Sequence, residues 1–171
     1  MDFVDTLAER MSSPRDLLRQ PRDLEVWIAS AGLGRVASVS DNQLRQSKEL
    51  REFIHEAVSS AVEGRKIPKS AIVRINKIAR QPGLRPQYVD GRVVLQAENP
   101  FDAALSSIAA DAIENIAPAN RARLRRCLEC QMLFRDNSRP GRRQWCSSSS
   151  GCGNRAKVRR HRAKLKEQQS R

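Results

Sequence analysis

Long apolar runs are absent from this 171-residue sequence. No stretch approaches the roughly 18 apolar residues that a helix needs to cross a bilayer, so we expect no membrane location. The first residues also lack the basic start and apolar core of a secretory signal. We therefore expect a cytoplasmic protein, in which clustered cysteines bind metal more often than they form disulfides.

Sequence motifs of catalysis are missing as well. The chain has no glycine-rich nucleotide-binding loop, no nucleophile motif and no cluster of carboxylates suited to a metal ion. Its two histidines are isolated from each other. We expect His55 at the surface of a helix, and His161 on a solvated or phosphate-facing helix among arginines. These absences predict that the protein is not an enzyme.

The first 120 residues have no net charge, and the net positive charge of the chain lies in the remaining residues. Residues 1–120 carry 16 Lys and Arg against 16 Asp and Glu, whereas residues 121–171 carry 16 against 3, a net charge of +13. Such a charge favours a polyanionic partner. Nucleic acid fits better than an anionic membrane, because the basic segment is too polar to insert an apolar face.

The length suits one ordinary core with a small appended module. We expect a mainly α fold with a small β-hairpin, made of a helical domain over residues 1–120 and a small basic module over residues 121–171. Apolar residues at three-and-four spacing predict the helices. The expected helical segments are 3–8, 20–32, 40–64, 70–80, 99–116 and a basic connector at 119–126.

Two local patterns support this interpretation of the first domain. Ser40 followed by Gln43 fits a capping box at the start of the longest helix, and Gly64 is placed to end it. Asp90-Gly91 between apolar residues predicts a hairpin with a type I′ turn. Because a two-stranded hairpin is marginal alone, we expect it to pack on the helices.

All four cysteines lie inside the basic segment, in a stretch of 26 residues from Cys127 to Cys152. Cys127 and Cys130 are separated by two residues, and Cys146 and Cys152 by a polar, serine-rich stretch that can form a loop. Two converging cysteine pairs give zinc a closed tetrahedral site with no open position, so the metal would be structural. A segment with so few large apolar residues needs such a metal to fold.

Four further roles for the cysteines stay open at the level of sequence. They are two disulfides, four free thiols without a role, a redox-active Cys-x-x-Cys pair and an iron–sulfur cluster. Structural Zn²⁺ is favoured over each of them, because the expected location is reducing and no thioredoxin-like pattern surrounds the first pair.

A basic helix is expected to begin at the last cysteine and to bind nucleic acid through phosphate contacts. Two competing interpretations are a solvated basic tail that binds acids unspecifically, and a capping role for Asn154. No residue pattern indicates readout of a base sequence. The residues expected to contact nucleic acid are Arg139, Arg142 and Arg143 in a loop, and Asn154, Arg155, Lys157, Arg159, Arg160, Arg162 and Lys164 in the helix.

Several motifs resemble a known pair of domains. Three motifs in the basic segment resemble the CGNR zinc finger, whose name the last of them spells. They are Phe-x-Asp-x-Ser-Arg at 134–139, Trp-Cys-Ser at 145–147 and Cys-Gly-Asn-Arg at 152–155. Upstream, Phe-Val-Asp-Thr-Leu at 3–7, Asp-Leu-x-x-Trp at 23–27 and Ile-Asn at 75–76 resemble the ABATE domain that usually precedes it.

The resemblance implies bacterial, stress-related transcription regulators whose zinc-bound C-terminal element binds DNA. It implies that Cys127, Cys130, Cys146 and Cys152 are the zinc ligands. The chain departs from the family in the spacing of both pairs, since the first is narrower and the second wider than usual.

The sequence therefore predicts a DNA-binding transcription regulator with double-stranded DNA as its partner. In this hypothesis the N-terminal domain senses a small-molecule effector or forms a homodimer. The alternative is an adaptor that binds RNA polymerase or structured RNA through the basic zinc module.

Overall fold

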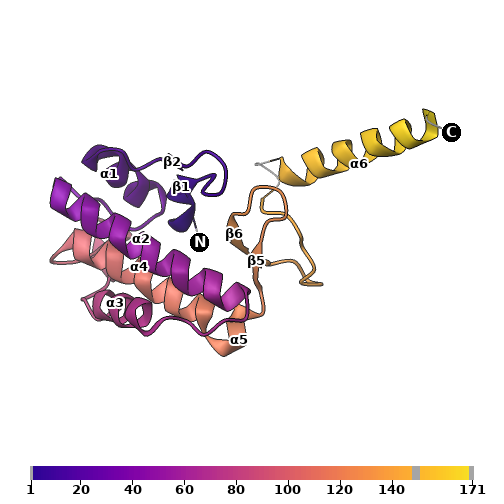
Figure 1. The fold of residues 1–171 in the computed structure, drawn as a ribbon. Coiled ribbons are helices and arrows are strands. Elements are labelled where there is room, and N and C mark those ends of the chain that lie inside the picture. Colours follow the sequence, from indigo (N-terminus) through magenta and orange to yellow (C-terminus); the bar gives the residue numbers. More distant parts are fainter. Residues whose placement is uncertain (1, 148–150, 170–171) are drawn as a thin grey trace.

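The computed structural model describes residues 2–147 and 151–169 and shows a helical body with a smaller module at its end (Figure 1). We call residues 2–121 the body and the described residues from 122 onward the module. The body helices are α1 Pro21–Ser30, α2 Asp41–Val62, α3 Lys69–Ala79, α4 Pro100–Ile116 and α5 Pro118–Arg121, and the module ends in α6 Cys152–Gln169.

In the described residues, three separate two-stranded antiparallel sheets accompany the helices, and the 3-10 turn Val4–Thr6 precedes the first of them. The predicted mainly α fold with a small β-hairpin is therefore confirmed, and two further strand pairs that were not predicted accompany it. The strand pairs are β1 Leu7–Ala8 with β2 Arg15–Asp16, β3 Arg85–Val89 with β4 Arg92–Gln96, and β5 Leu124–Arg126 with β6 Leu133–Arg135.

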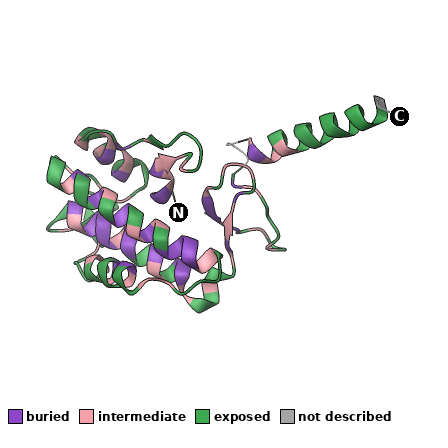
Figure 2. Cartoon of the chain, in the orientation of Figure 1, coloured by how far each residue is buried: buried purple, intermediate pink, exposed green. Residues whose placement is uncertain are grey.

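The core lies where α2 and α4 pack together, with α3 and α1 against them (Figures 1 and 2). Leu50 and Val58 of α2 are fully buried, as are Ile75 of α3 and Ile28 of α1. Four of the ten buried residues of α4 are alanines, which have no side chain beyond Cβ and let helices approach closely. None of the helices in the described residues is long and apolar enough to cross a membrane.

Both local patterns predicted in the body are present. Ser40 Oγ accepts a hydrogen bond from the Gln43 N–H at 3.2 Å, while Gln43 Oε1 accepts one from the Ser40 N–H at 2.8 Å. Gly64, with φ +67°, follows the end of α2. Asp90 and Gly91 both have positive φ, as a type I′ turn between β3 and β4 requires.

The predicted helix at residues 3–8 is wrong, although Phe3 and Val4 are buried as expected. A tertiary contact replaces it: the buried guanidinium of Arg51 donates to Asp16 Oδ1 at 2.8 Å and to Thr6 Oγ1 at 3.2 Å. This contact ties the short β1–β2 pair to α2, so long-range packing overrides the local helical pattern.

Two further expectations about secondary structure and packing are wrong. The connector at 119–126 stays helical only to Arg121, because Leu124 joins the main core from the paired strand β5. The β3–β4 hairpin does not pack on the helices as expected. Nearly all its residues are exposed, and the side chain of Tyr88 is 78% exposed.

Candidate metal centre and basic helix

Four cysteine sulfurs converge in the module. All lie within 4.8 Å of one another, with Sγ–Sγ distances of 3.7 Å from Cys130 to Cys146 and 3.6 Å from Cys146 to Cys152. A tetrahedron with metal–sulfur bonds of about 2.3 Å has edges of about 3.8 Å. The sulfurs therefore have the spacing of a tetrahedral zinc site. None of the four cysteines, including Cys127, forms a disulfide in the structure, and the two Sγ–Sγ distances are much longer than the roughly 2.0 Å of a disulfide bond. The geometry therefore favours a metal site over the two-disulfide alternative.

The backbone around the first cysteine pair forms a tight turn. The Gln131 N–H donates to the Cys127 carbonyl at 3.0 Å, and the Cys127 N–H donates to the Met132 carbonyl at 2.8 Å. Gln131 has φ +62°, which reverses the chain directly after Cys130. We call residues 127–131 the cysteine turn.

Crowding of the thiols creates a need for a cation. Burial raises the pKa of Cys127, but backbone N–H donors from Cys130, Cys146 and Glu129 outweigh it and lower the pKa to about 7. Burial, followed by hydrogen bonds within the cluster, raises the pKa of Cys130. Four thiolates this close repel one another unless a dication joins them, so the donor set fits Zn²⁺.

The loop between β6 and the third cysteine is organised by Asp136, whose side chain is 1% exposed. It accepts hydrogen bonds from the Ser138 hydroxyl at 2.6 Å, the Ser138 N–H at 2.9 Å and the Arg143 N–H at 2.8 Å. The Ser138 hydroxyl and the Arg143 N–H are the main causes that lower the pKa of Asp136 to about 2. Arg139 and Arg142 lie at the exposed surface of this loop.

The helix α6 begins at Cys152, as predicted, and projects away from the body (Figure 1). Asn154 lies inside the helix rather than before it. From Lys157 onward the residues of α6 whose burial is described are exposed (Figure 2). The serine-rich loop predicted between the last two cysteines falls partly on residues 148–150, which lie outside the described residues.

The cationic residues predicted to contact nucleic acid divide into two groups. Arg143 donates to the Cys146 carbonyl at 2.5 Å and lies over the Phe134 ring, and Arg155 and Arg159 contact Glu129. Within residues 2–147 and 151–169, the side chains of the second group have no hydrogen-bond or ion-pair partner. Its members are Arg139, Arg142, Lys157, Arg160, Arg162 and Lys164.

Glu129 is the residue that sequence reasoning missed. It lies in the cysteine turn, and its two carboxylate oxygens accept hydrogen bonds from Arg159 at 2.8 and 2.6 Å. Arg155 Nε lies 3.8 Å from the same carboxylate. Arg159, the largest cause, lowers the pKa of Glu129. The sequence does contain a signal that could have pointed to Glu129, namely an acidic residue between two cysteines in a strongly basic segment.

Polar contacts join the module to the body. Arg126 donates to Glu63, directly after α2, at 2.8 Å, and Arg135 donates to Asn115 of α4 at 2.9 Å. Leu133 of β6 also belongs to the main core. The cysteine turn is therefore attached to the body through β5 and β6.

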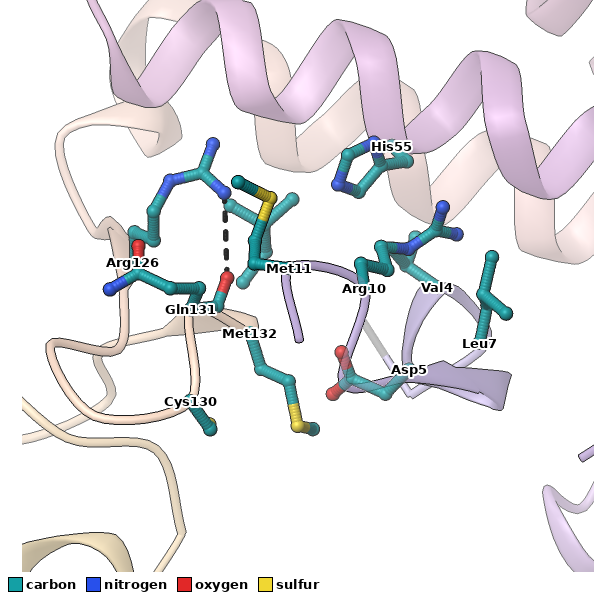
Figure 3. Close-up of a pocket in the computed structure, with 11 residues that line it drawn as sticks. Val4, Asp5, Leu7, Arg10, Met11, His55, Arg126, Cys130, Gln131 and Met132 are labelled. Carbon is teal, nitrogen blue, oxygen red and sulfur yellow. Dashed lines mark hydrogen bonds between the residues drawn. The ribbon is translucent and has the colours of Figure 1, made fainter. Parts of the chain in front are cut away.

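A small cavity lies at this junction (Figure 3). Asp5 and His55 line it from the body, and Cys130 and Met132 from the module. Its volume of about 20 Å³ admits about one water molecule, so it is too small for an organic effector.

Two titratable groups of the body that line this cavity, His55 and Asp5, have shifted pKa values. His55 is half-buried, contrary to prediction, and burial, aided by Arg10, lowers its pKa to about 4. Burial, aided by Asp2, raises the pKa of Asp5 to about 7.

A helical body joined to a small module with four converging cysteines defines a zinc-finger protein. Comparison with known families matches residues 1–118 to ABATE, described as "Putative stress-induced transcription regulator". Residues 123–164 match the CGNR zinc finger. The chain therefore belongs to the ABATE family and carries a C-terminal CGNR zinc finger, and its sulfur cluster is consistent with the zinc site of that finger. No curated protein matches the chain.

Proposed function

We propose that this protein is a transcription regulator that binds double-stranded DNA through α6. The observation that carries the proposal is the exposure of this helix, together with cationic side chains that have no partner in the described part of the chain. The description of the ABATE family as a transcription regulator agrees with it and favours a non-enzymatic role.

Zinc would be held by Cys127, Cys130, Cys146 and Cys152. The metal would supply the folding free energy that this small module lacks, as structural zinc does in other fingers. Because Cys152 is also the first residue of α6, the centre would fix where the helix begins.

The surface proposed to contact DNA is one side of α6. Lys157, Arg160 and Lys164 follow one another at three- and four-residue spacing, so they share a face of the helix. They span about 10 Å along the axis at about 1.5 Å per residue, which allows contact with successive phosphates. We call these three residues the free basic face. Arg139 and Arg142 of the loop offer a second group of phosphate contacts.

The body is proposed to regulate this binding, by sensing an effector or by forming a homodimer. The contacts of Arg126 with Glu63 and of Arg135 with Asn115 are proposed to carry a change in the body to the module. The cavity of Figure 3 is not proposed as an effector site, because of its volume.

The test is binding of the zinc-loaded full chain to labelled genomic DNA fragments, with duplex RNA as competitor and at several salt concentrations. We expect DNA to be bound and some fragments to be preferred. Preference for RNA, or co-purification of RNA polymerase that survives nuclease treatment, would support the adaptor alternative and contradict the proposal. Binding that ignores sequence at every salt concentration would contradict the regulator role.

A further inference from the structure

The two basic sides of α6 have different surroundings. The free basic face has no partner in the described residues, whereas Arg155 and Arg159 turn toward the cysteine turn. Arg155 Nη2 donates a hydrogen bond to Cys152 Sγ at 3.0 Å, and its Nε lies 3.8 Å from Glu129. Arg155 therefore directs its guanidinium at a sulfur and a carboxylate of the module, whereas a phosphate-binding arginine directs it at a partner.

The contact with sulfur has a clear physical consequence. Four thiolates on a dication leave an excess of negative charge, and a guanidinium donor offsets part of it through a charge-assisted hydrogen bond. Groups that hold the ligands of a metal from outside orient them and tune the affinity, typically by a factor of 10 to 100. Arg155 is placed to act in this way on Cys152.

The carboxylate of Glu129 completes the arrangement. Arg155 and Arg159 are four residues apart and lie on the same side of α6, so one carboxylate can reach both. Glu129 is 13% exposed at its side chain, whereas Arg159 is 67% exposed. Glu129 lies between the first two cysteines, whereas α6 begins at the last cysteine. The contact therefore connects the two ends of the module outside the metal centre.

We propose that Arg155 is a positioning residue for the metal centre rather than a nucleic-acid contact, and that Glu129 holds α6 against the cysteine turn through Arg155 and Arg159. This inference rests on the zinc site of the proposed function and is independent of DNA binding. Because exposed ion pairs contribute little to the free energy of unfolding, the effect is expected in metal retention and helix position.

The first experiment compares Arg155→Gln with Arg160→Gln in the zinc-loaded full chain. Both variants lose one positive charge from α6, but only Arg155 contacts a sulfur. We expect Arg155→Gln to lower zinc affinity about 10-fold, measured by competition with a chromophoric chelator. In the cobalt-substituted protein it should shift the sulfur-to-metal charge-transfer band. Arg155→Lys, which keeps a cationic donor, should restore part of the affinity.

Equal zinc affinity and equal cobalt spectra in the Arg155→Gln and Arg160→Gln variants would overturn the role of Arg155. DNA binding gives an independent check at saturating zinc. If Arg155 instead contacted phosphate, Arg155→Gln would reduce the log–log salt slope by about 0.9. If the wild-type chain fails to bind DNA, the proposed function fails, whereas the metal measurements still decide this inference.

The second experiment is a charge exchange between Glu129 and Arg159. Glu129→Arg and Arg159→Glu should each speed hydrogen exchange in the first turns of α6, while the double variant should restore protection. Glu167→Arg, far along the helix, is the control for the charge change. Additive losses in the double variant would show that Glu129 and Arg159 do not hold each other, and would overturn the proposal for Glu129.

Discussion

Asp5 is the residue whose protonation differs most clearly from that of an exposed carboxyl. Burial is the largest cause that raises its pKa from 3.8 to about 7, Asp2 adds to it, and Arg10 opposes it. The folded chain thus binds a proton more tightly than the unfolded chain between about pH 4 and 7. The stability from this group is present at low pH and is lost as pH rises through about 7.

Replacing Asp5 by Asn should therefore stabilise the protein at pH 8, where the native state otherwise carries a buried carboxylate. We expect a gain on the order of 4 kcal/mol in the free energy of unfolding at pH 8, and none near pH 4. Urea denaturation at both pH values measures it, with the exposed Glu56→Gln as a control. A gain that is the same at both pH values would contradict the assignment to Asp5.

Residues with local signals were predictable, and residues whose role depends on distant partners were not. The four cysteines were predicted because their number and spacing determine what metal they can hold. Glu129 was missed because its partners, Arg155 and Arg159, approach only after the module folds. His55 was misplaced because no sequence pattern indicated that the module would cover that side of α2.

The same distinction holds for whole elements. The longest helix and the β3–β4 turn follow from contacts within a few residues, namely the capping box at Ser40 and the positive φ of Asp90 and Gly91. The pairs β1–β2 and β5–β6 have strands of only two or three residues, too short for any periodicity. Their stability comes from distant groups, such as Arg51 for the first pair.

The capping box makes a prediction for α2. Ser40→Ala removes the acceptor of the Gln43 N–H and should lower the free energy of unfolding by about 1 kcal/mol. Ser38→Ala is the matched control, because Ser38 is exposed and has no hydrogen bond within the described residues. Urea unfolding of the two variants measures the difference, and equal stability would show that the cap is unimportant for α2.

At the scale of the whole molecule, the two parts should respond differently to loss of the metal. Cys152→Ser removes one of the four sulfurs at the point where α6 begins. We expect loss of zinc and of DNA binding, while the helical content of the body is largely kept, because α1 to α4 form their own core. Circular dichroism, zinc content and mobility shifts check this. A variant that binds DNA normally would contradict the role of the module.

The central claim is that the free basic face of α6 contacts DNA phosphates. Its most direct test is the salt dependence of DNA affinity for the wild type and for the Lys157→Gln, Arg160→Gln, Lys164→Gln triple variant, both zinc-loaded. The triple variant should bind more weakly, and its log–log slope should fall by roughly 0.9 per lost contact. A body triple variant at the exposed Lys66, Lys69 and Lys77 should keep the wild-type slope. Equal slopes in the α6 variant and the wild type would contradict the claim.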